Sequence, residues 1–590
     1  MRARNSYTKA SISAILTAVI VSSSLFMAAP ISVAADPTAR KILTGWIPYY
    51  SMKTALPAAI NNGDLVKEVM PFWYTLKSES KITDLYTPAN PSVPMANPLA
   101  AMRDSGFTVI PTITDGTDKF ALAKILADVT LRTTLVSTIT NLVLINNFQG
   151  IDLDFEGFAF VDGSATWPAT QPNWVLFIHE LSTSLHLQGR LLSVTTPVLF
   201  DPASGKKGYY VYDWAAIAQD IDRLRIMTYD YSTSSPGPIG PLSWAEKAVQ
   251  YAVSVVPASK VYVGLAGYGR DWVTSVIGIC PGAVAKSITP TAKAATFVMR
   301  DAATLASSYS ATPLYNDSYG EVTFTYQKVY NGPSASGLAT TCTASRTAWY
   351  MDARGYAARA QLVGKYHLGG ITAWTLGMED QSAIDAIRQV AQSIAPDQIV
   401  SSLTTDASQL SFGTPFTVKA VFSLADKQPI VGLPVRVEAQ NPGDASWHTV
   451  LDSITGDDGS VETTLLVGKT TSLRASSDGT WDRTASQSAS VTISLKRLIS
   501  ITMPASALIG ETFAITGVVQ PHEAGLPVAL EEFVQGKWLA SAQGGITDES
   551  GHYEIITRKL SRGFAKFRVS ASGNSALTGA TSPGFTVVIY

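Results

Sequence analysis

Cysteine is almost absent from this chain. The 590 residues include only two, Cys280 and Cys342. So few thiols exclude a small fold held together by a disulfide framework, and they exclude a zinc site built on several thiolates. Both cysteines lie in one region of the chain, so a single disulfide bridge between them is compatible with the sequence.

An excess of basic residues is also missing. Lys and Arg number 44 against 46 Asp and Glu, and charged residues make up only 15% of the chain. Nothing therefore draws the protein electrostatically to nucleic acid, and we expect no nucleic-acid partner. The chain is 46% hydrophobic, which is too apolar for disorder, and it is too long for one small domain. Two or more domains are expected.

Long hydrophobic runs are missing after residue 35. In the first 35 residues, basic side chains occur at residues 2–9, an apolar stretch spans residues 12–27, and small residues of the kind found at signal-peptidase cleavage sites occupy residues 32–35. This pattern predicts a secretory signal peptide over residues 1–35, and the alternative is an uncleaved membrane anchor. Cleavage leaves 41 basic and 46 acidic residues. We expect a mature protein that is secreted or associated with the cell wall, with no membrane partner.

Residues 36–395 alternate short apolar runs with longer amphipathic stretches. This alternation is typical of repeated βα units around a parallel sheet. A helix is expected at 173–187, where apolar side chains recur at steps of three and four. The candidate strands lie at residues 42–50, 69–76, 108–113, 150–156, 191–197, 224–229, 260–266 and 370–375. Eight such units predict an α/β fold, the (β/α)8 or TIM barrel.

The seventh and eighth expected strands are separated by about 100 residues, far more than a loop and a helix need. Both cysteines fall inside this stretch. We expect a small α+β insertion there, over about residues 271–368.

Beyond residue 397 the composition shifts to Thr, Ser, Val and Gly, with alternating strands and turn dipeptides. This half repeats itself: Gly-Leu-Pro-Val at 432–435 recurs at 525–528, and Trp447 recurs as Trp538. The spacing predicts two immunoglobulin-like β-sandwiches, over residues 398–496 and 498–590. Glycan binding and a spacer role are both open for them. A recurring tryptophan in a sandwich more often belongs to the core than to a sugar-stacking surface.

The segment 147–157 carries the most chemical information. Side chains alternate along a strand, so Asp152, Asp154 and Glu156 share one face at intervals of about 6.6 Å. In a barrel this acidic face lines the interior, and Glu156 stands at the carboxyl-terminal mouth, where barrel enzymes keep their chemistry. Burying unpaired carboxylates is unfavourable, so we expect shared protons and a raised pKa of the kind that a general acid needs.

Two other interpretations of the three acids are open. Buried Arg or Lys could satisfy them as an incidental feature of the strand. Acids at alternate positions could also hold Mg²⁺ or Ca²⁺, but the segment offers no His and has the pattern of a strand rather than of a looped cage. No phosphate-binding loop, dinucleotide fingerprint or Cys/His cluster stands in a supporting context. We expect no metal and no cofactor.

The pattern Gly150-x-Asp152-x-Asp154-x-Glu156 resembles the signature of family-18 glycoside hydrolases, the chitinase-like barrels. The position of the insertion is similar too. Gln149 departs from the family's usual Asp; because it starts the strand, we expect altered strand support or pKa coupling rather than lost catalysis. Further motifs follow in the family's order, namely Met-Thr-Tyr-Asp at 227–230, Gly-Leu-Ala-Gly-Tyr-Gly-Arg at 264–270 and Gly-Gly-Ile-Thr-Ala-Trp at 369–374.

The resemblance implies a retaining hydrolase of β-1,4-linked N-acetylglucosamine polymers that works by substrate-assisted catalysis. Glu156 would protonate the glycosidic oxygen and then act as base toward water. The sugar's own 2-acetamido oxygen would attack the anomeric carbon. Asp154 would hold the acetamido N–H and Asp152 would tune Asp154 from below, while Tyr229 would bond the acetamido carbonyl.

Substrate binding is assigned on the same basis. Asp230 and Met227 belong to the strand-six motif and would lie against the substrate. Trp374 would form the floor of the −1 subsite, because an indole presents a flat apolar face to a sugar ring. Trp46 is a weaker candidate of the same kind. Ordinary core packing is the alternative for the tryptophans and for Tyr229.

Chitin and peptidoglycan both carry the required N-acetyl group. Residues 229–244 and 374–377 resemble the spore-cortex and cell-wall N-acetylglucosaminidase branch of the family, which favours peptidoglycan modestly. The alternative function is a lectin-like protein of the cell wall that kept the barrel and lost catalysis. Such proteins usually lack the acid at the position of Glu156, and here it is present.

Overall fold

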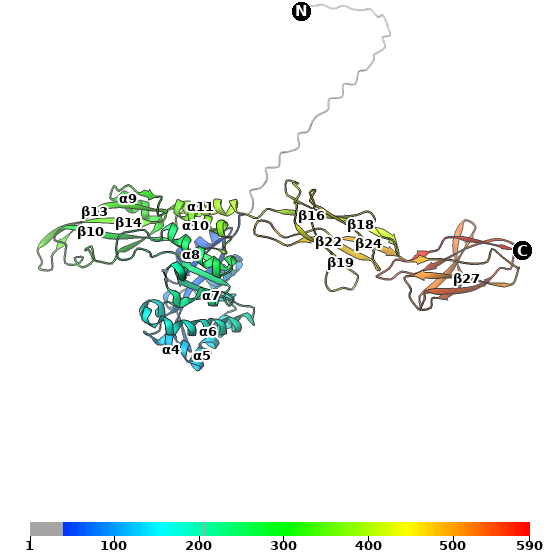
Figure 1. Cartoon of the computed structure of the whole chain (residues 1–590), viewed down its shortest axis with the longest axis horizontal. Coiled ribbons are helices and arrows are strands. Elements are labelled where there is room, and N and C mark those ends of the chain that lie inside the picture. The colour runs from blue at the N-terminus through cyan, green and yellow to red at the C-terminus, as the bar shows by residue number, and fades with distance from the viewer. Residues whose placement is uncertain (1–38, 205, 207) are drawn as a thin grey trace, which may run out of the picture. The chain divides into compact units, whose positions relative to one another are not determined.

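The computed structural model describes residues 39–204, 206 and 208–590. The expected signal peptide, residues 1–35, lies outside the described residues. In the described part, no helix combines the length and the apolar character that crossing a bilayer requires. Figure 1 distinguishes a barrel of helices and strands, an attached β-rich lobe and two all-β modules.

Within the described residues, eight parallel strands close into a barrel, so the predicted TIM barrel is confirmed. The first and second strands pair with each other and complete the ring. In spatial order the strands are β1 Leu43–Pro48, β2 Val66–Ser78, β5 Thr112–Asp115, β6 Gly150–Asp154, β7 Leu191–Pro197, β8 Arg223–Met227, β9 Val261–Ala266 and β15 Gly370–Trp374. A short strand, β3 Lys81–Asp84, pairs antiparallel with β2.

The third expected strand, 108–113, is divided in the structure. Residues Thr108–Val109 form β4 and residues Thr112–Asp115 form β5, both pairing with β2. Pro111 lies at the break, where its missing N–H removes one hydrogen bond of the ladder. Its carbonyl oxygen instead accepts from the N–H of Asp152, 2.8 Å away, so the next strand is still held in register.

The helices pack their apolar sides against the barrel strands and share one hydrophobic core with them. The helix expected at 173–187 is α6 Trp167–His186; it starts earlier because Pro168 suits the first turn of a helix. The others are α1 Met52–Asn61, α2 Tyr86–Ala89, α3 Ala96–Asp104, α4 Ala121–Ala127, α5 Val129–Ile145, α7 Trp214–Ile217, α8 Leu242–Val255, α10 Ala353–Tyr366 and α11 Gln381–Ser393.

A β-rich lobe occupies the predicted insertion between β9 and β15. Its described strands form an antiparallel sheet in the order β11-β10-β14-β13-β12, and one helix, α9 Ala302–Ser308, packs with it. A disulfide joins Cys280 to Cys342, with the sulfur atoms 1.96 Å apart. The strands are β10 Tyr268–Gly278, β11 Ala295–Val298, β12 Leu314–Asn316, β13 Glu321–Pro333 and β14 Ala339–Tyr350.

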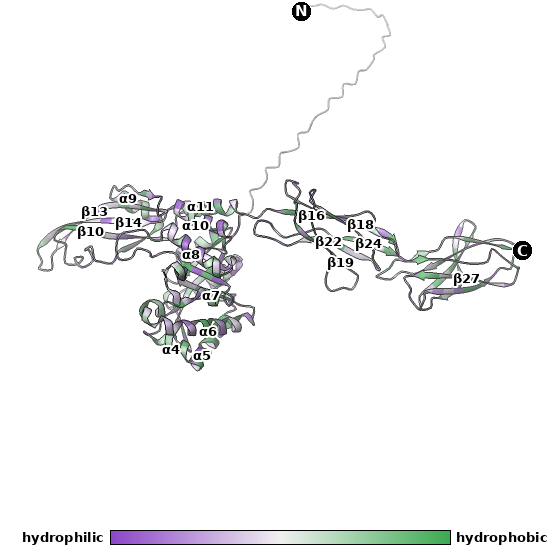
Figure 2. Ribbon diagram, viewed as in Figure 1, coloured by the Kyte–Doolittle hydropathy of each residue, from purple (hydrophilic) through white to green (hydrophobic). Residues whose placement is uncertain are grey.

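The two expected all-β modules follow the barrel, each with its own hydrophobic core. The described strands of the first are β16 Ile399–Thr405, β18 Phe416–Leu424 and β21 Ser460–Leu465 in one sheet, and β17 Gln409–Ser411, β24 Val491–Lys496, β22 Thr471–Ser477, β19 Pro434–Gln440, β20 His448–Ile454 and β23 Ser486–Gln487 in the other. Figure 2 shows polar and apolar residues mixed along these strands, as expected where only one face of each sheet is buried.

The second module repeats this arrangement. One sheet contains β25 Leu498–Ile499, β27 Thr512–Gln520 and β30 His552–Arg558; the other contains β26 Ser506–Ala507, β33 Phe585–Ile589, β31 Gly563–Ala571, β28 Pro527–Val534, β29 Lys537–Ile546 and β32 Ala580–Thr581. The immunoglobulin-like identity of both modules and the limits of all domains stay predictions.

A buried ion cluster lies in the amino-terminal half of the barrel. Glu68 on β2 contacts Arg223 at 2.7 Å and Arg225 at 2.6 Å, and its own side chain is 1% exposed. Burial alone raises the pKa of Glu68, but the charges and hydrogen bonds of the two arginines outweigh it and lower the pKa from 4.5 to about 2. Glu68 is therefore ionised in the folded barrel at neutral pH.

Glu68→Gln should destabilise the barrel by about 3–5 kcal/mol at pH 7, because it leaves the two buried arginines without their counterion. The difference from the parent protein should shrink as the pH falls from 4.5 toward about 2, since Glu68 becomes protonated there. Urea unfolding of the full chain measures both effects. The control is Glu246→Gln, which removes the exposed pair with Lys365 and should cost less than about 1 kcal/mol. Equal losses in both variants would contradict this role of Glu68.

Candidate active site

Of the three acids predicted to share one strand face, Asp152 and Asp154 lie on the inner face of β6; the strand ends at Asp154, two residues earlier than expected, so Glu156 lies beyond it. Asp152 is fully buried, Asp154 is 8% exposed, and Glu156 follows the strand at the mouth. The intervening side chains, Ile151, Leu153 and Phe155, point the other way into the hydrophobic core. Above the acids lies a cleft of about 960 Å³, which both Asp154 and Glu156 line.

Asp152, the lowest acid, is held by hydroxyl groups. Thr112 donates to it at 2.8 Å, Ser193 at 2.6 Å and Thr195 at 3.0 Å. Arg225 lies 3.9 Å away and also donates to the Ser193 hydroxyl. Both oxygens of Asp152 are therefore engaged from the neighbouring strands, as suits a buried carboxylate.

Asp154 and Glu156 are joined by a side-chain hydrogen bond. Burial raises the pKa of Asp154 well above its usual value, and the neighbouring Glu156 and Asp152 raise it further. Burial also raises the pKa of Glu156; the hydrogen bond to Asp154 lowers it and the charge of Asp230 raises it again. Burial and the proximity of the two groups thus favour a proton shared by this pair.

One oxygen of Asp154 has no partner among the described residues. Its Oδ1 is buried and accepts no hydrogen bond. A buried oxygen of this kind is unfavourable unless a donor reaches it. Asp154 lines the cleft as a residue, while this oxygen is itself buried in the structure.

Gln149 lies at the start of β6, away from the cleft. Its side-chain oxygen accepts from the N–H of Val109 at 3.1 Å, and the Gln149 N–H donates to the Val109 carbonyl at 3.2 Å. The amide therefore holds the short strand β4 next to the break at Pro111. This is a strand-supporting contact, and it leaves the three acids in place.

The residues predicted from the strand-six motif line the same cleft, at and just beyond the carboxyl end of β8. Tyr229 is 9% exposed, and burial raises its pKa well above 10, so the phenol keeps its proton as a donor. Asp230 has a φ of 60°, a conformation that Asp tolerates better than most residues. Its carboxylate accepts hydrogen bonds from the Tyr268 hydroxyl and, at 2.5 Å, from Arg270. Met227 also lines the cleft.

Aromatic rings form the floor of the cleft. Trp374 is half-buried and meets Trp46 and Phe72 edge-on, with ring centroids 5.6 and 4.9 Å apart. Trp46 is only 1% exposed, and its indole N–H donates to Thr112 at 3.1 Å. Trp374 is therefore the ring available to a ligand, whereas Trp46 mainly supports it.

Sequence reasoning missed Asp115 as a cleft residue. It ends β5, and its Oδ1 accepts from the Thr117 N–H at 3.0 Å and the Thr117 hydroxyl at 2.7 Å. The Asp115 carboxyl group also accepts a hydrogen bond from the backbone N–H of Gly157. A Cβ added at Gly157 would lie only 2.0 Å from Asp115 Oδ2. Asp115 thus fixes the backbone directly after Glu156. Its place at a strand's carboxyl end was the available signal.

Tyrosine and arginine contacts around the cleft were missed as well. Tyr212 donates to the Phe155 carbonyl at 2.7 Å and so braces the strand that carries the acids. Tyr268 and Arg270 stand in the strand-seven motif, yet that motif alone did not reveal that both bond Asp230. Among the described residues, no three His, Cys, Asp or Glu side chains are grouped so as to hold a metal ion.

Comparison with known proteins identifies relatives of the barrel. Residues 47–379 match Glycosyl hydrolases family 18. "Putative sporulation-specific glycosylase YdhD" of Bacillus subtilis (strain 168) is 25% identical over 351 residues, which cover 58% of this chain and 73% of that protein. The "Cortical fragment-lytic enzyme" of the same organism is 24% identical over 258 residues, covering 43% of this chain and 52% of that protein.

Among solved structures, a chitinase from Chromobacterium violaceum ATCC 12472 is 24% identical; the match covers 59% of this chain and 98% of that chain, with a TM-score of 0.47. Because the family match spans more than half of the sequence and includes the whole acidic strand, this chain belongs to Glycosyl hydrolases family 18 and is a glycoside hydrolase.

Proposed function

We propose that the protein hydrolyses β-1,4 linkages of N-acetylglucosamine-containing polymers with retention of configuration, by substrate-assisted catalysis. The observation that carries this proposal is the hydrogen-bonded Asp154–Glu156 pair that lines the cleft, with one oxygen of Asp154 left unpartnered among the described residues. The pair supplies a proton at the mouth and an acceptor for an amide N–H beside it.

The other acids of the cleft are poorly suited to act as the nucleophile. Asp115 accepts hydrogen bonds from Thr117 and Gly157, and Asp230 accepts from Tyr268 and Arg270. A carboxylate whose oxygens accept hydrogen bonds in this way is a weaker nucleophile. The acetamido oxygen of the substrate is then the group left to attack the anomeric carbon.

The reaction proceeds in two steps. In the first, protonated Glu156 gives its proton to the glycosidic oxygen; the C–O bond to the leaving sugar breaks as the acetamido oxygen bonds to the anomeric carbon. In the second, Glu156 takes a proton from water, and the resulting hydroxyl attacks the anomeric carbon and opens the oxazolinium ring. Two displacements at one carbon retain its configuration.

The remaining residues position the amino sugar. Asp154 accepts a hydrogen bond from the acetamido N–H through its unpartnered oxygen and balances the positive charge of the intermediate. Asp152, below Asp154 on the same strand, influences the pKa of Asp154 through its charge. Tyr229 donates its hydroxyl to the acetamido carbonyl. Trp374 stacks below the ring at the −1 subsite, and Asp230 and Met227 lie against the substrate.

The charged side chains that line the described cleft are acidic, namely Asp115, Asp154, Glu156 and Asp230. They favour an uncharged sugar in the subsites next to them. The similarity to a cortical fragment-lytic enzyme and to a chitinase supports peptidoglycan and chitin as the candidate substrates, with a tilt toward peptidoglycan. Both are extracellular polymers, which agrees with secretion or attachment to the cell wall.

Glu156→Gln should fold normally and lower kcat on a soluble N-acetylglucosamine oligomer by about 10²–10⁴-fold, because glutamine has no proton to give to the leaving oxygen. The measurement is release of reducing sugar, with circular dichroism as the check of folding. Glu246→Gln, an acid outside the cleft, serves as the control and should leave turnover unchanged. Unchanged turnover in Glu156→Gln would remove Glu156 from its role.

A substrate without its acetamido group should be inert, since the nucleophile is then missing. The comparison uses chitin oligomers and their deacetylated counterparts of equal length, with products counted by mass spectrometry. A binding measurement with the deacetylated oligomer separates failed chemistry from failed binding. Rapid cleavage of the deacetylated chain would contradict participation of the acetamido group.

A further inference from the structure

Both all-β modules carry the same surface cluster of tryptophan, arginine and glutamate. In the first module it consists of Trp447, Arg474 and Glu438, and in the second of Trp538, Arg568 and Glu531. We name these the first and second Trp–Arg–Glu clusters. They lie outside the barrel, and the catalytic proposal makes no use of them.

The first cluster lies on the outer face of the larger sheet. Glu438 on β19 stands opposite Arg474 on β22, and the two side chains form an ion pair at 2.9 Å. The guanidinium carbon of Arg474 lies 4.3 Å from the centre of the Trp447 ring, which is a cation–π contact. Arg474 is thereby held between the carboxylate and the indole.

The second cluster has the same construction. Glu531 on β28 stands opposite Arg568 on β31, with an ion pair at 2.6 Å, and the guanidinium carbon lies 4.5 Å from the Trp538 ring. The six-membered ring of Trp538 lies next to Gly584: a Cβ added to Gly584 would lie 3.1 Å from Cη2 of the indole. Phe533, 41% exposed, packs beside the indole at 5.1 Å. The indole thus crosses the outer face of the sheet.

The tryptophans occupy equivalent positions. In the second module, Trp538 pairs with Phe533, which lies two residues after Glu531. In the first module, His448 pairs with Ala439, so the preceding residue, Trp447, lies opposite the residue two positions after Glu438. Both tryptophans are half-buried and belong to neither module's hydrophobic core. The expectation that they are core residues is therefore wrong, because the outward positions of these strands carry them.

A packing role explains these clusters poorly. Each core is already filled by other apolar residues, and the two half-buried ion pairs lie outside these cores. An indole fixed flat against a guanidinium is instead a rigid apolar platform with hydrogen-bonding groups at its rim. A pyranose ring matches it, because the ring's C–H face stacks on the indole and its hydroxyls bond to charged groups.

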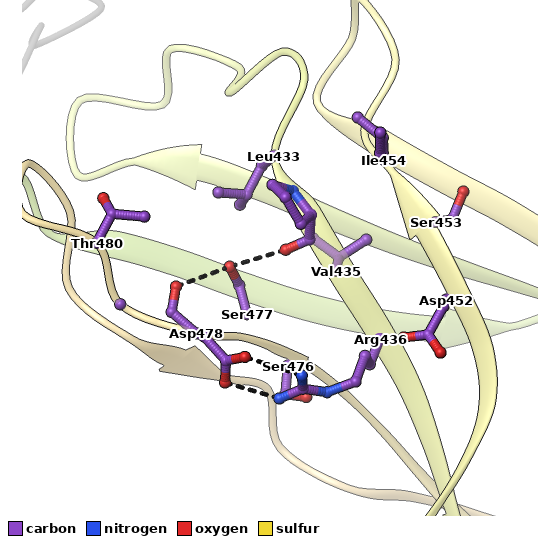
Figure 3. Close-up of a pocket in the computed structure, with 12 residues that line it drawn as sticks. Leu433, Val435, Arg436, Asp452, Ser453, Ile454, Ser476, Ser477, Asp478 and Thr480 are labelled. Atoms are coloured by element: carbon purple, nitrogen blue, oxygen red, sulfur yellow. Dashed lines mark hydrogen bonds and ion pairs between the residues drawn. The ribbon is translucent and has the colours of Figure 1, made fainter.

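A pocket of about 550 Å³ lies toward the start of β19 and is lined in part by Arg436 and Asp478. Arg436 lies two residues before Glu438 on β19, so both side chains point outward. Figure 3 shows the paired hydrogen bonds between Arg436 and Asp478 that cross this pocket, at 2.7 and 2.8 Å. In the repeat, Ala529 stands where Arg436 does. The Trp–Arg–Glu cluster is present in both modules although the neighbouring residues differ.

We propose that the two Trp–Arg–Glu clusters are carbohydrate-binding sites, each stacking one sugar ring of an insoluble glycan on Trp447 or Trp538. The first site also receives sugar hydroxyls in the Arg436–Asp478 pocket, and the second relies on stacking beside Phe533. Two weak sites on one chain act together, since binding at one raises the local concentration of glycan at the other. The inference rests on the proposed function only for the choice of glycan.

The test uses the full chain and measures depletion from solution by insoluble chitin and by purified peptidoglycan. The double variant Trp447→Ala, Trp538→Ala should bind at least tenfold more weakly than the parent, and each single variant should lose less. Hydrolysis of a soluble oligomer should stay unchanged, because neither residue lies in the cleft. The control is Ile556→Ala, which removes an exposed apolar side chain on the other sheet of the second module and should bind as the parent does.

Unchanged binding of the folded double variant to both glycans would overturn the inference. If the variants fail to fold, oxidation of exposed tryptophans in the parent protein replaces them, with each site read out by peptide mass spectrometry. Trp447 and Trp538 should be protected by a soluble oligomer, and equal oxidation with and without it would also overturn the inference. A parent that binds glycan yet hydrolyses neither polymer refutes the proposed function and leaves the clusters as binding sites.

Discussion

Carboxylates stacked along one buried strand face repel each other and resist removal from water, and the barrel is built around this constraint. At its lower end, Asp152 receives the hydroxyls of Thr112, Ser193 and Thr195 and lies near Arg225. Arg225 is in turn held by Glu68, whose low pKa keeps it ionised. Fixed charges and dipoles thus stabilise the acid in the lower part of the barrel. The unfavourable burial and repulsion of carboxyl groups therefore affect mainly the upper acids.

The same arrangement makes the two ends of the strand chemically different. Asp154 and Glu156 share a hydrogen bond and have raised pKa values, and a buried oxygen of Asp154 has no donor among the described residues. Asp115 braces the backbone after Glu156, and Tyr212 braces it before that residue. Glu156, the proposed proton donor, is therefore held by contacts on both sides, which is what efficient proton transfer requires.

Local patterns in the sequence were sufficient for the barrel and for the acidic face. Alternation along the strand correctly placed Asp152 and Asp154 on the buried inner face, whereas Glu156 follows the end of β6 with a helical backbone conformation. The ion cluster of Glu68 with Arg225 was not predictable, because residues more than 150 positions apart meet only when the barrel closes. The early start of α6 was missed because the first residue of a helix depends on its capping contacts, which hydrophobic periodicity does not show. The outward position of Trp447 and Trp538 was missed because the sheet face of a side chain depends on strand pairing.

The central claim is that the substrate supplies its own nucleophile above the Asp154–Glu156 pair. The most direct test is proton NMR of a β-linked N-acetylglucosamine oligomer during its first minutes with the enzyme, before the product's anomers equilibrate. The account predicts that the newly formed reducing end first appears as the β-anomer, since two displacements occur at the anomeric carbon. Initial appearance of the α-anomer would show a single displacement by water and would contradict the account.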